Sequence, residues 1–206
     1  DAENWNAENP NSPLRRGVGV AGMWYGCGNT SLPNPSTIKV GLRKNGRAVL
    51  FQGAVDIGQG SNTIMAQICA DASGLSVDCF DLVYGDTDLT ADAGKTSASR
   101  QTVVSGKASY LAGLDLRANL QRMTNTEDVS DLSALEEDVR GFVAYGEGTF
   151  DPPTSPLDEN GQGIPYAVYG YGAHMVELSV DTKLGCVDLI KITASHDVGR
   201  AINPML

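Results

Sequence analysis

The clearest pattern along the chain is an alternation of apolar and polar positions over residues 37–44. A period of two predicts a half-buried strand, because successive side chains of a strand point to opposite faces. The apolar positions that share one face are Ile38, Val40 and Leu42. Asn45-Gly46 follows, a pair typical of a type I′ turn, and the apolar residues 48–51 predict the returning strand of a hairpin.

Further segments also predict strands. Residues 174–181 alternate in the same way, and residues 187–195 are expected to pair with them through a turn at residues 181–185. The glycine-rich residues 17–26 predict a strand whose small side chains let another backbone approach closely. Residues 80–84 predict one more strand.

A spacing of three and four residues between apolar positions predicts two helices. The first is expected to begin at Ser61 or Asn62, either of which can cap it. It is expected to end near residue 73, where the following Gly74 suits a helix C-terminus. The second, longer helix is expected over residues 99–123.

The remaining segments are less regular. A capping-box pattern at Ser133 predicts a short helix to about residue 140, and the glycines and prolines of residues 146–165 predict an extended loop. Residues 1–16 are polar and are expected to form a linker or a torn edge. This leaves residues 17–206 as one folded region, with room for an internal break near residues 125–165. Hairpins and helices without a fixed repeat predict an α+β fold.

Length and charge restrict the class of protein. At 206 residues the chain suits one large domain or two small ones. Its net charge of −10 argues against nucleic acid and anionic membrane surfaces as general partners, although backbone donors can still hold a phosphate locally. No apolar run approaches the ~20 residues that a membrane helix needs, and no secretory signal precedes the predicted fold. We therefore expect no membrane partner.

None of the cysteines stands in a C-x-x-C spacing, which argues against an iron–sulfur or zinc site within this chain. Cys69 falls on the apolar face of the first predicted helix and is expected in the core. The full set is Cys27, Cys69, Cys79 and Cys186. Reduced structural thiols are the expected state, which fits a cytoplasmic protein.

The first candidate for chemistry is a glycine turn between a predicted strand and a predicted helix. Gly58 and Gly60 allow a left-handed backbone, and N–H groups at a helix N-terminus can hold a phosphate. Gln59 offers a donor and an acceptor to a ring system, while Ser61 and Asn62 can cap the helix or contact the phosphate. The alternative is a strand–helix turn that holds no ligand.

A second loop of the same kind precedes the long predicted helix. It supplies hydroxyl groups and positive charge beside the start of a helix, as a pyrophosphate requires. Its residues are Lys95, Thr96, Ser97, Ala98, Ser99, Arg100, Gln101 and Thr102. The alternative is a serine-rich helix cap with solvated charges. The spacing fits neither a P-loop nor a dinucleotide-binding glycine fingerprint.

A third candidate, residues 196–204, directly follows a predicted strand. His196 beside Asp197 is either a structural hydrogen bond or a catalytic pair, and His174 is expected to be structural. Glu147, in a Gly-Glu-Gly sequence, is either a general base or a solvated loop residue.

These three segments together resemble the molybdenum-binding subunit of the xanthine oxidase family, the molybdenum hydroxylases. Residues 55–60 are similar to the cofactor-contacting Gly-Gln-Gly loop of that family, and residues 96–99 to its second cofactor loop. Residues 197–204 resemble a signature near the dinucleotide end of the cofactor, and residues 171–177 fit the strand that leads to it. The first two loops are most similar to the bacterial aldehyde oxidoreductase branch.

The resemblance implies a molybdopterin-binding fold over residues 17–206 and a molybdopterin cofactor, in bacteria usually the cytosine dinucleotide form. It implies hydroxylation of an aldehyde or an N-heterocycle, purine-like or nicotinate-like, with oxygen derived from water. Electrons would leave through 2Fe–2S clusters and often reach FAD, both in partner domains or subunits. By this match Ala98 lies adjacent to molybdenum. The cofactor-binding residues would be Gly58, Gln59, Gly60, Ser61, Asn62, Thr96, Ser97, Ala98, Ser99, Arg100, Gln101 and Asn203.

The catalytic glutamate of the family is expected outside this chain, downstream of the third signature. The iron–sulfur cysteines and further cofactor loops are expected in the remaining parts of the molybdenum subunit and in an iron–sulfur partner, with FAD in another. We therefore expect the isolated chain to be inactive, whether it is a domain, a proteolytic remnant or part of a split subunit. The alternatives are a non-catalytic scaffold domain with empty cofactor loops and a nucleotide-binding domain unrelated to molybdenum.

Overall fold

A computed structural model describes residues 2–29, 32–125 and 132–204 of the chain. The chain divides into two compact units. The smaller unit comprises Asp1–Gly26 and Val168–Arg200, and the larger comprises Cys27–Ala167 with Ala201–Leu206. The sequence instead suggests one region with a break near residues 125–165. The division differs because strand pairing between distant segments, which local composition does not reveal, defines the smaller unit.

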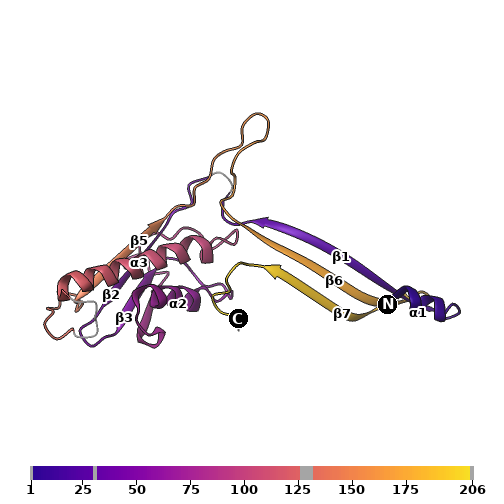
Figure 1. Ribbon diagram of the computed structural model, residues 1–206, viewed down its shortest axis with the longest axis horizontal. Coiled ribbons are helices and arrows are strands. Elements are labelled where there is room, and N and C mark those ends of the chain that lie inside the picture. The colour runs from indigo at the N-terminus through magenta and orange to yellow at the C-terminus, as the bar shows by residue number, and fades with distance from the viewer. Residues whose placement is uncertain (1, 30–31, 126–131, 205–206) are drawn as a thin grey trace. The chain divides into compact units, whose positions relative to one another are not determined.

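The smaller unit is a three-stranded antiparallel sheet in the order β1-β6-β7 (Figure 1). The three strands are the ones that the alternating and glycine-rich segments predict, and the turn of the β6–β7 hairpin lies where it is expected. The N–H of Gly185 closes that turn by donating to the carbonyl of Asp181 at 2.7 Å. The elements are α1 (Ala2–Glu8), β1 (Leu14–Gly26), β6 (Tyr169–Asp181) and β7 (Cys186–Asp197).

Helix α1 lies where the sequence suggests a linker or a torn edge. Asn6 and Arg16 bond each other's backbone, with Asn6 Nδ2 donating to the Arg16 carbonyl at 2.8 Å and the Arg16 N–H donating to Asn6 Oδ1 at 2.9 Å. The Arg16 guanidinium also lies 4.7 Å from the centre of the Trp5 ring. These contacts tie α1 to the start of β1, and a polar composition alone does not reveal them.

Both faces of the smaller sheet expose apolar side chains. Val20 and Trp24, each 73% exposed, lie on one face of β1. Leu189 and Ile192 of β7 lie on the opposite face and are 63% and 57% exposed. Among the described residues of this unit, Ala2 is the only buried hydrophobic residue. The described residues of this sheet therefore form no hydrophobic core of their own.

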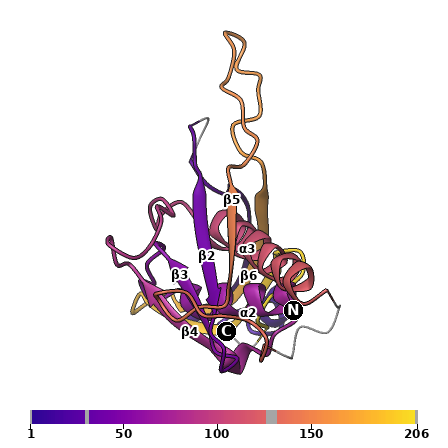
Figure 2. The ribbon, with the colours of Figure 1, turned by 90° about the vertical axis from the view of Figure 1, so that its left-hand side faces the viewer.

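The larger unit is a four-stranded sheet in the order β4-β3-β2-β5, with α2 and α3 packed side by side over one face (Figures 1 and 2). Strands β3 and β4 run parallel, and the other neighbours are antiparallel. A short 3₁₀ turn, Val77–Cys79, precedes β4. The elements are β2 (Ser36–Leu42), β3 (Ala48–Gln52), α2 (Ser61–Ser73), β4 (Phe80–Tyr84), α3 (Gln101–Thr124) and β5 (Ala144–Phe150).

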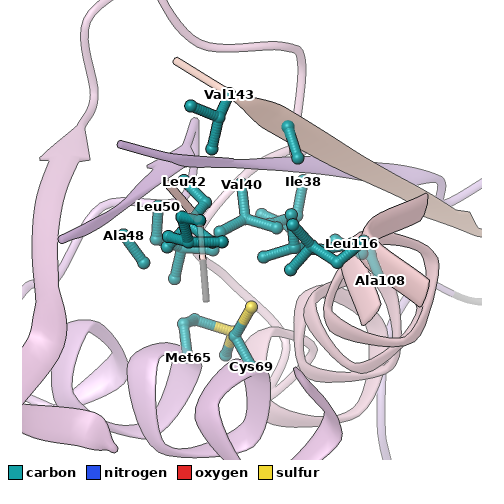
Figure 3. Packing of buried hydrophobic residues seen from close by; sticks show 14 of the residues in the cluster. Ile38, Val40, Leu42, Ala48, Leu50, Met65, Cys69, Ala108, Leu116 and Val143 are labelled. Atoms are coloured by element: carbon teal, nitrogen blue, oxygen red, sulfur yellow. The ribbon is translucent and has the colours of Figure 1, made fainter. Parts of the chain in front are cut away.

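The core of the larger unit fills the space between sheet and helices (Figure 3). The predicted apolar face of β2 points inward and meets Met65 and Cys69 of α2 and Leu116 of α3. Burial raises the pKa of the Cys69 thiol to about 12, so this cysteine is a neutral packing residue, as predicted. The described residues contain no helix that combines the length and the apolar character needed to span a bilayer.

The β2–β3 hairpin is confirmed, but its turn differs from the predicted type. Gly46 takes a left-handed φ of 81°, whereas Asn45 does not have the positive φ that a type I′ turn requires. The Gly46 N–H donates to the Arg43 carbonyl at 2.9 Å, and the Arg43 N–H donates to the Arg47 carbonyl at 2.8 Å. The result is a three-residue loop in which the glycine forms a bulge.

The helix predicted after Ser133 does not form, and residues 132–143 are turns and extended chain. Leu132 and Leu135 are buried and contribute to the core. An amphipathic helix would next need Val139 on the same face, yet Val139 is fully exposed at 104%. Leu132 and Leu135 are thus buried by a single turn, and the chain then continues into β5 without forming a helix.

Residues 144–150 form strand β5, although the sequence suggests that its last five residues belong to an extended loop. Gly146 and Gly148 face α3 so closely that a Cβ on either would overlap helix backbone. Such glycines mark a close approach of strand and helix, and sequence alone does not distinguish this from loop flexibility.

Candidate functional site

Two loops meet at one edge of the larger sheet because the strands before them are parallel neighbours. Residues 53–60 follow β3, and residues 85–100 follow β4. The carboxyl ends of parallel strands lie at the same edge, where ligand sites of α/β arrangements form. Thr96 joins the loops directly, since its Oγ1 donates to the Val55 carbonyl at 2.8 Å and accepts from the Val55 N–H at 3.2 Å.

A pocket of about 420 Å³ lies between the two loops. It brings together most of the residues of the second predicted motif and two residues of the first, Ile57 and Gln59. Its lining residues are Ile57, Gln59, Thr96, Ser97, Ala98, Ser99, Arg100, Gln101 and Thr102. Among the described residues, the predicted Gly58, Gly60, Ser61, Asn62 and Asn203 do not line it.

The second loop has an unusual backbone where it enters α3. Ala98 and Ser99 both take left-handed φ values, 55° and 53°. Residues other than glycine rarely adopt this conformation, and when held there they tend to mark functional sites. Helix α3 then begins without a side-chain cap at Arg100. The positive end of a 24-residue helix therefore lies at the pocket, where it favours an anionic ligand.

The first loop uses its backbone donors differently from the sequence interpretation. The Asp56 carboxylate accepts from the N–H groups of Gly58 at 2.8 Å, Gly60 at 3.3 Å and Asn62 at 3.2 Å. These bonds, that of Gly58 first, lower the pKa of Asp56. The N-terminus of α2 thus already holds a negative charge. Asp56 is a site residue that the glycine pattern does not single out, although Asp-x-Gly is a recognisable side-chain turn signal.

The polar side chains of the first loop divide between pocket and interior. Gln59 is exposed, with Oε1 accepting from the Ile57 N–H at 2.7 Å and Nε2 donating to Ser61 Oγ at 3.2 Å. Ser61 is buried, and Asn62 Oδ1 accepts from Nε2 of buried Gln52 at 2.5 Å. Gln59 is therefore the polar side chain of this loop that lines the pocket, with its amide atoms bonded within the loop.

Arg100 is fully buried and does not present its charge to solvent. A guanidinium has five N–H donors, and all five bond protein oxygens here. Nε donates to Asn34 Oδ1, Nη1 to the carbonyls of Ala93 and Lys95, and Nη2 to those of Asn34 and Pro35, at 2.5–3.1 Å. Burial lowers the pKa of Arg100, although an arginine stays charged.

Gln101 also turns toward the protein. Its Nε2 donates to the Lys95 carbonyl at 3.1 Å and to Thr96 Oγ1 at 3.3 Å, while its Oε1 accepts from Ser105 Oγ. Arg100 and Gln101 together brace the loop from behind. The sequence pattern indicates their proximity to the pocket but not the direction of their polar atoms.

The other candidates are not among the residues that line this pocket. In the smaller unit, His174 and His196 bond each other across β6 and β7, with 2.7 Å between their Nε2 atoms. Asp197 Oδ1 instead accepts from the Gly199 N–H at 3.0 Å, so the His–Asp pairing that the sequence suggests is replaced by a His–His contact. Glu147 forms an exposed ion pair with Lys39 at 2.8 Å, which agrees with the solvated alternative.

Comparison with known proteins places the chain in a family. The sequence model of one protein family, the molybdopterin cofactor-binding domain, matches residues 1–206. The 6-hydroxypseudooxynicotine dehydrogenase complex subunit gamma of Paenarthrobacter nicotinovorans is 27% identical over 81% of this chain and 23% of its own length. A probable hypoxanthine oxidase of Escherichia coli is 27% identical over 98% of this chain and 22% of its own.

A solved structure agrees with these relatives. The aldehyde oxidoreductase from Desulfovibrio desulfuricans superposes with a TM-score of 0.83 at 26% identity, covering 98% of this chain and 22% of that one. An α+β unit whose paired loops form one pocket is thus a cofactor-holding module. The chain belongs to the molybdopterin cofactor-binding domain family of the molybdenum hydroxylases. It spans less than a quarter of the length of these relatives.

The pocket fits the group that the family holds. It combines neutral donors such as Gln59 and the hydroxyls of Ser97 and Ser99 with the positive end of α3. The buried guanidinium of Arg100 adds positive charge behind the loop. Within the described ranges there is no group of three or more His, Cys, Asp or Glu side chains that could hold a metal ion. The arrangement suits an anionic organic cofactor held through hydrogen bonds.

Proposed function

We propose that this chain is the cofactor-holding part of a molybdenum hydroxylase that oxidises an aldehyde or an N-heterocycle with oxygen derived from water. The observation that carries the proposal is the pocket at the N-terminus of α3, with left-handed Ala98 and Ser99, in a chain of this family. The names of the relatives, an aldehyde oxidoreductase and a probable hypoxanthine oxidase, support both substrate classes.

The proposed contacts follow from the direction of each group. Gln59, Ser97, Ala98 and Ser99 would contact the cofactor, with Ala98 adjacent to molybdenum, and the first N–H groups of α3 would face its anionic part. When bound, the cofactor supplies the redox chemistry of the hydroxylation. The residues of this chain hold and orient it. Asp56 and Arg100 would not contact the cofactor; they would hold the two loops through bonds to the loop backbones.

We further propose the cytosine dinucleotide form of the cofactor, with Asn203 near its nucleotide end. Electrons would leave through 2Fe–2S clusters and FAD in partner domains or subunits. One relative is named as a subunit of a complex, which supports a multi-subunit enzyme. Cys27, Cys69, Cys79 and Cys186 all lie in the described part of the chain and are not joined in disulfides, which supports a cytoplasmic location. Because the catalytic glutamate is expected elsewhere in the parent protein, the isolated chain is proposed to be inactive.

The first experiment is metal and nucleotide analysis of the complete subunit that contains this chain. Molybdenum is measured by mass spectrometry, and CMP by chromatography after acid hydrolysis. We expect the two in near-equal amounts. Absence of both would contradict the proposal and favour a scaffold domain with empty loops, whereas GMP or AMP in place of CMP would correct the cofactor form.

A matched pair of variants connects the result to this pocket. Ala98→Leu places a larger side chain into the lining and is expected to lower the molybdenum content at unchanged yield of folded protein. Ala134→Leu, at an exposed position away from the pocket, is the control. Equal molybdenum content in both variants would show that the cofactor lies elsewhere.

A further inference from the structure

The tip of the second cofactor loop is held by residues outside every predicted motif. The Gly28 N–H donates to the Ala98 carbonyl at 2.8 Å. This bond fixes the residue whose φ is left-handed and which lines the pocket. Gly28 itself has a φ of +101°, which other residues rarely adopt. The contact therefore depends on a glycine at this position.

Asn34 connects this contact to Arg100. Its Oδ1 accepts from Arg100 Nε at 2.5 Å, and its backbone carbonyl accepts from Arg100 Nη2 at 3.0 Å. Asn34 is itself only 6% exposed, and its N–H donates to Asp151 Oδ1 at 2.8 Å. One end of the Arg100 guanidinium is thus fixed by Asn34, and Asn34 is in turn held by Asp151, directly after β5.

Gly28 and Asn34 also fit against each other sterically. A Cβ on Gly28 would lie 2.7 Å from Asn34 Nδ2, closer than real Cβ contacts allow. The Asn34 side chain therefore occupies the space beside Gly28 while it bonds Arg100. At its other end, the guanidinium donates to the carbonyls of Ala93 and Lys95, which precede Thr96 in the chain.

We propose that Gly28, Asn34 and Arg100 are positioning residues that set Ala98 and Ser99 in their left-handed conformation before the cofactor binds. The inference rests on the proposed function of the pocket. Arg100 connects the start of the loop, through the Ala93 carbonyl, to the Asn34 carbonyl. Gly28 holds the tip of the loop through the Ala98 carbonyl. A preorganised loop binds its ligand without losing further conformational freedom. Loss of the network is expected to leave the fold intact but the loop mobile.

The test uses the complete subunit with Asn34→Leu, which keeps the side-chain volume but removes the acceptor for Arg100. Hydrogen–deuterium exchange of the Gly28 and Arg100 amides, which donate to the carbonyls of Ala98 and Ser97, is measured without cofactor, and molybdenum and CMP are measured in the purified protein. We expect exchange about tenfold faster or more, since hydrogen bonds to a charged group are lost. We expect a matching loss of molybdenum, with unchanged exchange in the core of α3.

Conservative variants separate positioning from general damage. Asn34→Asp keeps an acceptor for Arg100 and is expected to restore slow exchange and cofactor content. Arg100→Lys keeps the charge but cannot form the fork, so it is expected to behave like Asn34→Leu. Asn160→Leu and Arg117→Lys, both at exposed positions, are the matched controls. If Asn34→Leu does not fold, Arg100→Lys compared with Arg117→Lys gives the same measurement.

The outcomes distinguish this inference from the proposed function. Unchanged exchange at the amides of residues 28 and 100 and unchanged molybdenum in Asn34→Leu and Arg100→Lys would overturn the positioning role. Faster exchange in the variants together with no molybdenum in the unmodified subunit would support the positioning role and contradict the proposed function.

Discussion

At the scale of single residues, the charged groups nearest the pocket serve the loops rather than the ligand. Asp56 accepts from two backbone N–H groups of the first loop and one at the start of α2, and Arg100 gives all its donors to protein oxygens. The sequence pattern indicates that charge and hydroxyl groups gather here. It does not indicate their direction, because direction depends on carbonyls that lie far away in the chain, such as those of Asn34 and Pro35.

Asp56 makes the first loop dependent on pH. Its pKa is lowered in the folded chain, so its ionised form stabilises the loop above the unfolded pKa of about 3.9, and this stabilisation is lost as pH falls through the lower folded pKa. We expect the Gly58 amide signal in ¹H–¹⁵N spectra to titrate with a midpoint below about 3.9. Asp56→Asn should abolish this titration and leave Gly58 and Gly60 more mobile.

Asp71→Asn, at an exposed position of α2, is the control and should leave the Gly58 titration unchanged. A Gly58 midpoint at or above the ordinary aspartate value would show that Asp56 does not hold the loop.

At the scale of elements, the sequence predicts what local periodicity encodes. Strand β2 with its inward face, and helices α2 and α3, lie within a few residues of their predicted bounds. Strand β5 is missed because Gly146 and Gly148 remove the apolar alternation that a strand normally shows. Local periodicity also does not reveal the parallel pairing of β3 and β4. That pairing brings the two loops together, and it depends on contacts between segments that are distant in sequence.

The glycines of β5 are expected to be essential for its packing on α3. Gly148→Ala places a Cβ against the Ala108 carbonyl and 2.5 Å from the Ala112 nitrogen, so strand and helix must separate. We expect the free energy of unfolding to fall by about 1–3 kcal/mol, as for other overpacked cores. Denaturant unfolding of the chain measures this change.

Glu147→Ala, at the neighbouring outward position, removes only an exposed ion pair and should cost less than about 1 kcal/mol. Equal losses in both variants would mean that close packing on α3 is not the reason for the glycine.

At the scale of the whole chain, the two units differ in how they are stabilised. The larger unit has a continuous core between its sheet and helices, whereas the smaller sheet exposes apolar side chains on both faces. A sheet of three strands needs a covered face for stability in water. The relatives are more than four times as long as the segment matched here, so the cover is expected from the rest of the parent protein.

Limited proteolysis of the isolated chain tests this difference. Thermolysin, which cuts beside apolar residues, is expected to cleave within β1 and β7 before it cleaves within β2 or β3, because local opening is easier where few side chains are buried. Mass spectrometry identifies the fragments. In the complete subunit the same sites in β1 and β7 should resist cleavage, and early cuts within β2 in the isolated chain would contradict the assignment of the core.

The pairing of β1 with β6 also sets an order of folding. Gly26 pairs with Tyr169, yet residues 27–167, most of the larger unit, lie between them in the chain. In an unfolded polypeptide, closing so long a loop carries a large entropic cost before any contact compensates for it. Within this ladder the Gly26–Tyr169 pair closes the shortest loop and the Leu14–Asp181 pair the longest, so pairing of β1 with β6 is expected to begin at Gly26 and to proceed toward Leu14. The local β6–β7 hairpin, which needs only a short turn, is therefore expected to form first, and β1 to join this sheet last.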